Sequence, residues 1–358
     1  CHIYYFFRAA KLRVSAFDSL SVSFTSGDGK IFTVTIQAFI PMRKSLLCKT
    51  LTLWLVLSTL CLPGLTQSFP DSITVIPGPQ YEAGSWKSTL FGKHYRNVWT
   101  TPVRAKVATL DTLAGGLTPI LKGGGRQTRT LRLKDKNGKE YVLRSVDKTF
   151  GGALPDIMLG TFVEDLLNDQ VSTGHPYAAI TIPPMIKNTG IYHTLPRIYY
   201  IPKHPALDSF NKDFGDELYL FEERPDDDQS NTPNFGFSKN VISTEKLLEN
   251  VLSDNKNRVD QEAYIRARLF DLFIGDWGRH EDQWRWYTTD TGKGKIYHPI
   301  PRDRDQAFYT NQGLIPAYAK KRSLVPDIQG LRPQAYSIKS FNKSARNFDR
   351  AFLNELDQ

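Results

Sequence analysis

Two short stretches near the C-terminal end hold many residues that could do chemistry. Residues 275–284 read GDWGRHEDQW, and residues 299–308 read PIPRDRDQAF. Together they contain five carboxylates, one histidine and three arginines, and strongly apolar segments flank them. Gathered carboxylates are the natural oxygen ligands of Mg²⁺ or Mn²⁺, whose charge offsets their mutual repulsion. The two stretches therefore predict a metal-assisted site.

The elements expected around these stretches would bring them together. Residues 261–274 have apolar side chains around most of a helical circumference, which predicts a buried helix that Gly275 ends. Residues 284–287 and 295–298 predict two strands of a hairpin, with a turn at 290–294. Helix, polar loop and hairpin should then gather the acidic and imidazole side chains Asp276, His280, Asp282, Asp303 and Asp305.

The composition is that of a globular protein with a basic excess. The 358 residues carry a formal net charge of +9, and 40% of them are hydrophobic, so the chain can bury one large core or two modest ones. The excess could suit nucleotides, phosphorylated substrates or an anionic membrane surface. Because no nucleic-acid-binding module is present, we expect no nucleic-acid partner.

The N-terminal region predicts export. From Met42, basic residues precede the apolar run 51–62, which Pro63 and Gly64 end, so residues 42–67 have the three parts of a secretory signal peptide. We expect residues 1–41 to lie upstream of the translated protein; an anchor helix after a small N-terminal domain is the alternative. All three cysteines precede Ser68, which excludes disulfides and cysteine catalysis from 68–358. We expect a periplasmic or outer-membrane-associated protein.

A glycine-rich segment could bind phosphate. Gly123, Gly124 and Gly125 precede an expected strand at 130–133, a turn and a second strand at 140–146 that carries Arg144 and leads to Lys148. Glycines let backbone N–H groups approach phosphate oxygens, and the cations could neutralise them. Glycine-rich turns are common, so the pattern alone is weakly specific.

The remaining segments complete the expected order of elements. We expect residues 68–120 to form an irregular wrapping segment with one short helix at 86–91. A helix at 154–171, carrying Glu164, should precede strands near 179–182 and 194–200. A strand at 218–224 ends at Pro225 and an acidic loop, which predicts a boundary between residues 121–225 and 226–358.

This order and the two polar motifs resemble the atypical kinase-like group that includes HipA, the spore-coat kinase CotH, secretory-pathway kinases and phosphoinositide kinases. The resemblance covers roughly residues 121–308. It implies an α+β, two-lobed fold: an N-terminal lobe of antiparallel strands with one helix, and a mainly helical C-terminal lobe with a catalytic hairpin. The sequence also resembles an envelope family in which such a domain is joined to a calcineurin-like phosphoesterase or an outer-membrane barrel.

The resemblance implies roles for individual residues, with ATP and Mg²⁺ or Mn²⁺ as cofactors. The three glycines would cover the phosphates, Arg144 or Lys148 would pair with them and with Glu164, and residues 220–223, including Glu222, would line the adenine. Asp303, Asp305 and Gln283 would hold the metal. Asp276 would lie near the acceptor hydroxyl, in a catalytic loop with Arg279, His280 and Asp282. The acceptor would be an envelope protein, a lipid or a glycan.

Two positions depart from the pattern of the group. Gly278 stands where its members have Asp before Arg-His, and Gln283 stands where they have a metal-binding Asn. Asp276 or Asp282 would have to substitute. A metal-dependent kinase or nucleotidyl transferase is therefore one interpretation. A catalytically silent, nucleotide- or partner-binding domain in envelope assembly is the second, and a metal-dependent phosphohydrolase is the third.

Overall fold

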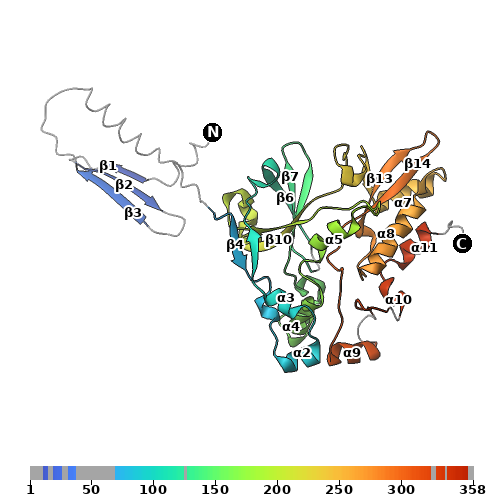
Figure 1. Cartoon of the computed structure of the whole chain (residues 1–358). Helices are drawn as coiled ribbons and strands as arrows, with labels where there is room; N and C mark the ends of the chain where they lie inside the picture. Colours follow the sequence, from blue (N-terminus) through green and yellow to red (C-terminus); the bar gives the residue numbers. More distant parts are fainter. Residues whose placement is uncertain are drawn as a thin grey trace. The chain divides into compact units, whose positions relative to one another are not determined.

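The computed structural model describes residues 11–14, 19–25, 31–37, 69–124, 127–323, 328–334 and 337–353 (Figure 1). The chain divides into two units, Cys1–Ser68 and Phe69–Gln358. In the first unit, three strands form an antiparallel meander: β1 (Lys11–Val14), β2 (Ser19–Thr25) and β3 (Ile31–Gln37). The signal peptide expected at 42–67 lies outside the described residues, and the start of translation at Met42 stays a prediction.

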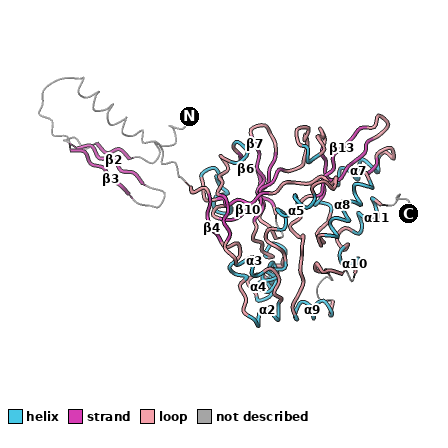
Figure 2. The backbone as a smooth tube through the Cα atoms, in the orientation of Figure 1, coloured by secondary structure: helices cyan, strands magenta, loops and turns pink. Residues whose placement is uncertain are grey.

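The second unit combines mainly antiparallel sheets with helices, which confirms the α+β class (Figure 2). Its largest sheet has five strands in the order β6-β7-β8-β10-β9, all antiparallel. The strands are β6 (Leu117–Gly123), β7 (Thr130–Asp135), β8 (Glu140–Ser145), β9 (Arg197–Ile201) and β10 (Glu217–Glu223). A small separate sheet pairs β4 (Ser72–Val75) with β5 (Val103–Lys106).

Alternation along the strands gives the five-stranded sheet two different faces. One face is apolar and packs into a core that includes Leu131, Leu143 and Phe221. Because successive strand residues point to opposite faces, Arg144 lies on the other face, directly opposite Leu220 of the neighbouring strand. Glu222, two residues further along β10, shares that face. The sheet thus presents a buried cation and a buried anion on its second face.

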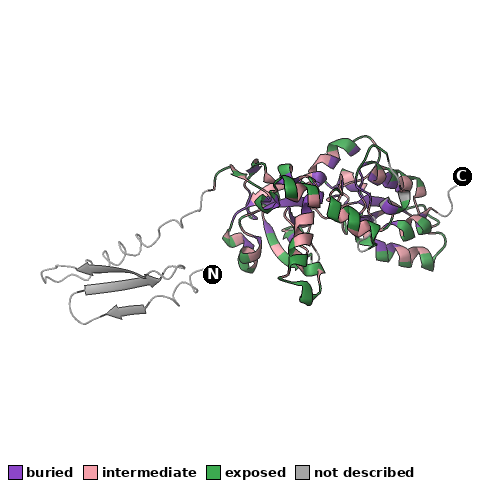
Figure 3. Ribbon diagram, turned by 90° about the horizontal axis from the view of Figure 1, so that it is seen from below, coloured by how far each residue is buried: buried purple, intermediate pink, exposed green. Residues whose placement is uncertain are grey.

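A second core surrounds the hairpin β13 (Trp284–Asp290) and β14 (Lys295–Pro301). The hairpin lies in a four-stranded sheet with β11 (Val241–Ser243) and β12 (Arg258–Val259). The helix α8 (Gln261–Phe273) packs its buried Tyr264 and Ala267 here, with Trp284 and Trp286 from the hairpin. Figure 3 shows the buried segments of the second unit in purple. Two further helices contribute to this core, α7 (Thr244–Ser253) and α11 (Arg346–Phe352).

The sequence predicted the helix α8 and most strands of the two larger sheets of the second unit. Asp260 caps α8 by accepting a hydrogen bond from the Ala263 N–H, and Gly275 follows its end with a positive φ of 67°. The predicted strands at 130–133, 284–287 and 295–298 lie within strands of the structure, and those at 140–146 and 218–224 extend one residue beyond theirs. The strand expected at 194–200 is β9, which begins only at Arg197.

Three expectations were wrong. Only α4 (Phe162–Asp169) is α-helical within 154–171, because Gly160 adopts a φ of 69° and Thr161 caps a new helix start. Residues 179–182 belong to a helix, α5 (Ala178–Ile186), whose buried positions follow helical spacing; it contributes to the core around the hairpin and to a third core, which includes Val146 and Leu220. The segment 68–120 is regular over much of its length, since it contains β4, β5, most of β6, α2 (Ser85–Phe91) and α3 (Arg96–Thr100).

Candidate functional site

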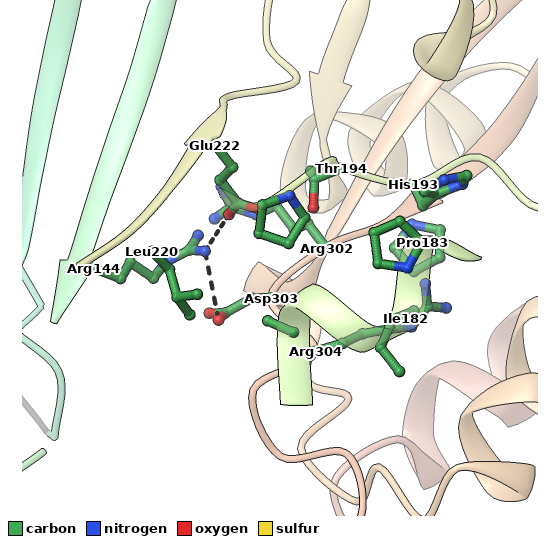
Figure 4. Close-up of a pocket in the computed structure, with 13 residues that line it drawn as sticks. Arg144, Ile182, Pro183, His193, Thr194, Leu220, Glu222, Arg302, Asp303 and Arg304 are labelled. Atoms are coloured by element: carbon green, nitrogen blue, oxygen red, sulfur yellow. Dashed lines mark hydrogen bonds and ion pairs between the residues drawn. The ribbon is translucent and has the colours of Figure 1, made fainter. Parts of the chain in front are cut away.

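Charged side chains from three distant parts of the second unit meet beside the five-stranded sheet. Arg144 on β8 forms an ion pair with Glu222 on β10, and both residues are buried. The same guanidinium group lies 3.6 Å from the carboxylate of Asp303, which follows β14 (Figure 4). The sheet and the loop after the hairpin thus share one charged cluster.

A second ion pair lies beside the first. The Lys148 ammonium group, just beyond β8, is 2.5 Å from the Asp305 carboxylate. Both side chains are more than four-fifths buried. Arg144 and Lys148, the two cations predicted to pair with phosphates, therefore hold the two aspartates predicted to bind metal.

The backbone conformation of Asp303 is unusual. Asp303 adopts a φ of 56°, in the left-handed region that few residues other than glycine occupy. Its side chain accepts a hydrogen bond of 3.2 Å from the Gln283 amide, and 22% of it is exposed. Such conformations occur at functional sites where surrounding contacts hold them in place.

Asp303 and Asp305 differ in their affinity for protons. Burial disfavours the ionised form of Asp303, but Arg144, Arg302 and Lys148 outweigh burial and hold its pKa below the ordinary value. Burial raises the pKa of Asp305, and although Lys148 opposes this shift, the neighbouring Asp303 adds to it. Asp303 thus suits permanent ligation of cations, whereas Asp305 is the better proton acceptor of the two.

Arg302 is a site residue that the sequence reasoning left without a role. It lines a narrow cavity with Arg144, Glu222 and Asp303, and its Nε donates to the Asp282 carbonyl. Burial, followed by the charges of Arg285 and Arg144, lowers its pKa to about 9. Because several cations lie close together here, the site favours the binding of an anion. In the sequence, the position of Arg302 immediately before Asp303 was the signal that could have identified it as a site residue.

The cavity itself is small. Its volume of about 20 Å³ leaves room for little more than one water molecule. A nucleotide base can enter only if the sheet and the loop after β14 move apart.

The predicted catalytic loop is largely buried. The side chains of Asp276 and Arg279 have no exposed surface, and they form an ion pair of 3.3 Å. Arg279 also lies 3.4 Å from Asp271, which pairs with Arg304 and Arg268. Burial raises the pKa of Asp276 to about 6 although Arg279 opposes the shift. This geometry does not fit an Asp276 carboxylate that faces an acceptor hydroxyl; the pair instead fixes the loop.

The remaining loop residues lie closer to the charged cluster. His280 has its Nε2 3.4 Å from the Gln283 amide nitrogen, and that amide bonds to Asp303. Asp282 is exposed, and only its backbone carbonyl reaches Arg302. His280 and Gln283 therefore belong to the site, while the Asp282 side chain points to no described partner.

One predicted pairing is wrong. Glu164 was expected behind Arg144 or Lys148, but its carboxylate accepts a hydrogen bond from the Gly160 N–H. The expectation failed because α4 starts at Phe162, so the acid lies in its first turn and serves the helix start. Glu222, predicted beside the adenine, is the ion-pair partner of Arg144.

The glycine segment is partly described. Gly123 ends β6, and Gly124 has a φ of 76°, with the Thr128 carbonyl 2.1 Å from where a Cβ would stand. Gly124 thus needs to be glycine, whereas Gly123 faces open space. Gly125 lies outside the described residues.

The donor set fits a divalent cation only in part. Within the described ranges, no group of three or more His, Cys, Asp and Glu residues could hold a metal ion. Asp303 and Asp305 supply two carboxylates, but Gln283 directs its amide N–H₂ to Asp303 and its oxygen toward Arg279. Since Mg²⁺ is usually bound by one or two carboxylates together with substrate phosphates, two aspartates are sufficient when a nucleotide supplies the other oxygens.

Comparison with models of known protein families, with curated proteins and with solved structures gave no match. Of the helices in the described part of the chain, none combines the length and apolar composition of a membrane span.

Proposed function

We propose that residues 121–353 form an atypical, two-lobed kinase-like domain that transfers the γ-phosphoryl group of ATP, with Mg²⁺ or Mn²⁺, to an acceptor in the cell envelope. The observation that carries this proposal is the convergence of Arg144, Lys148 and Arg302 with Asp303 and Asp305. Phosphoryl transfer requires charge neutralisation, in-line positioning and one proton acceptor, and these side chains can supply all three.

The order of elements supports the proposal. The hairpin β6–β7, which contains a glycine, precedes β8 with its buried cation, then the helix α4, and then β10, which leads into an acidic loop. Two helices follow, α7 and α8, then the Arg-His loop, and finally β14, which ends before Asp303. The cores around the five-stranded sheet and around β13–β14 are separate, as two lobes would require.

The side chains of the charged cluster have different roles in the proposed reaction. Arg144, Lys148 and Arg302 bind phosphate oxygens once these displace part of the ion pairs with Asp303 and Asp305. Asp303 would hold the metal ion, whose charge would help to neutralise the phosphates, and the Asp305 carboxylate would remain available as a base. The acceptor oxygen forms a bond to the γ-phosphorus, the bond from that phosphorus to the bridging oxygen breaks, and ADP leaves with the electron pair. Asp305 takes the acceptor proton.

The test compares ATP binding and ATP turnover in the full chain. We expect ATP with Mn²⁺ to raise the melting temperature, and Asp303→Asn to weaken that binding about tenfold, which corresponds to about 1.4 kcal/mol. Asp290→Asn, in the exposed turn of the hairpin, is the control and should bind like the wild type.

The results separate the two nucleotide-binding interpretations. Turnover of ATP that Asp303→Asn abolishes supports the transferase. Binding without turnover, with any metal or acceptor, would assign the catalytically silent alternative. If ATP and Mn²⁺ leave the melting temperature unchanged, both interpretations fail. If Asp305→Asn weakens ATP binding about tenfold and Asp303→Asn does not, then Asp305 rather than Asp303 is the main metal ligand.

A further inference from the structure

We infer that an apolar cavity beside Lys148 binds the hydrocarbon chain of the acceptor, so that the phosphoryl acceptor is the hydroxyl group of a lipid. This inference rests on the proposed function, and it names the substrate class of that site.

The cavity is much larger than the one between Arg144 and Asp303. Its volume is about 290 Å³, and its walls are predominantly apolar. They come from three helices: Phe91 ends α2, Leu166 and Leu167 lie on α4, and Ile315 and Ala319 lie on α9 (Leu314–Lys321) (Figure 1). A cavity of this size and lining suits a single hydrocarbon chain.

Two polar groups at the cavity lack partners. Gln170 Nε2 and Trp277 Nε1 are buried, and neither has a hydrogen-bond acceptor in the part of the chain that the structure describes. Both residues line the cavity. A buried N–H without a partner is costly. Because each of these two N–H groups has almost no surface open to the cavity, an ester oxygen of a lipid can accept from it only when the side chain turns toward the cavity.

The cavity leads to the proposed site of transfer. Lys148 lines it, and Lys148 also holds Asp305. A lipid with its chain between α4 and α9 would therefore place its head group near Asp305. Its hydroxyl oxygen would then be the acceptor in the proposed reaction: it would form the bond to the γ-phosphorus of ATP while the bond to the bridging oxygen breaks, and ADP would leave with the electron pair.

The same three helices expose large apolar side chains. Trp86 on α2, Phe162 on α4 and Tyr318 on α9 are 82%, 72% and 58% exposed. Arg322 stacks on Tyr318, and Lys321 ends the same helix. Exposed aromatic groups with neighbouring cations are typical of surfaces that contact anionic membranes. This combination favours a membrane lipid over a glycan, whose many hydroxyl groups would need polar walls.

Lipid binding can be measured without ATP. The full chain would be titrated with a dansyl-labelled fatty acid, which monodecanoylglycerol would then displace. Ala319→Trp fills the cavity and should weaken binding at least tenfold, whereas Ala317→Trp, on another face of α9, should bind like the wild type. Ile315→Glu places a carboxylate in the apolar wall at a half-exposed position, so it should fold and also bind at least tenfold more weakly; Ala317→Glu is its control.

The outcomes distinguish the inference from the function on which it rests. Saturable binding that only the cavity variants lose, together with transfer of labelled phosphate from ATP to monodecanoylglycerol, supports both. If the wild type binds no lipid, or Ala319→Trp and Ile315→Glu bind it unchanged, the inference is overturned, while ATP turnover decides the function separately. If the chain binds lipid but ATP leaves its melting temperature unchanged, the cavity remains a lipid-binding site, but the lipid is not a phosphoryl acceptor.

Discussion

At the scale of single residues, the Arg144–Glu222 pair gives the charged site a rigid base. Both side chains are more than nine-tenths buried. Glu222→Ala leaves a buried guanidinium group whose remaining ion pair among the described residues is the more distant one with Asp303, so the free energy of unfolding should fall by about 3 kcal/mol. Glu217→Ala, on the same strand, breaks a pair with Arg129 that is one-third exposed and should cost about 1 kcal/mol or less. Equal losses in urea unfolding would show that Glu222 contributes no special stability.

Asp276 should make stability depend on pH. Its pKa is raised from 3.8 to about 6 in the folded chain, so between these values the folded state binds more protons than the unfolded state. Stability contributed by this group is therefore present at low pH and is lost as pH rises to about 6. Arg279, Asp271 and Arg304 face the carboxylate, and the lowered pKa of Asp271 places its own effect below this range.

Urea unfolding of the wild type and Asp276→Asn at several pH values measures this effect. The stability of the wild type relative to the variant should decrease from about pH 4 to about pH 6 and then level off. A difference that grows with pH would mean that the pairing with Arg279 outweighs burial.

At the scale of elements, the β6–β7 hairpin depends on one glycine rather than on the whole glycine run. Gly124→Ala would place a Cβ against the Thr128 carbonyl at a positive φ, which should cost about 1 kcal/mol or more and displace the loop. Gly123→Ala meets open space and should be tolerated. If the hairpin covers the phosphates, the dissociation constant for ATP should rise several-fold in Gly124→Ala only. Equal ATP binding in both variants would remove this hairpin from the nucleotide site.

The elements that the sequence predicted correctly share clear local signals. The helix at 261–273 has a capping aspartate and a terminal glycine, and β7, β8 and β13 have β-branched or aromatic residues next to turn signals. The segment 179–182 failed because Ala-Ile-Thr-Ile suits a strand by propensity, while tertiary burial at helical spacing decided the outcome. The predicted pairing of Glu164 with Arg144 or Lys148 failed for a related reason, because an error in where a helix starts changes every side-chain pairing predicted from that helix.

At the scale of the whole molecule, the sequence indicated which residues belong to the site but not which of them are buried together. Asp276, Arg279, Asp303 and Asp305 were all singled out from two short stretches. The structure divides them into a buried network around Asp271 and a cluster that reaches across to the five-stranded sheet. That division depends on pairs separated by more than 150 residues, such as Lys148 and Asp305, which no local pattern specifies.

The Lys148–Asp305 pair joins the sheet to the segment after the hairpin, so it should couple their stabilities. Lys148→Met and Asp305→Asn each leave a mostly buried group without its partner, whereas the double variant removes both charges. A double-mutant cycle in urea should therefore give a coupling energy of about 1–2 kcal/mol. The same cycle on Lys122–Asp213, a pair about half exposed, should give a clearly smaller coupling energy because solvent screens it. Additive effects at Lys148 and Asp305 would mean that solvent screens the pair, and the site could then open for a nucleotide without losing stability at this contact.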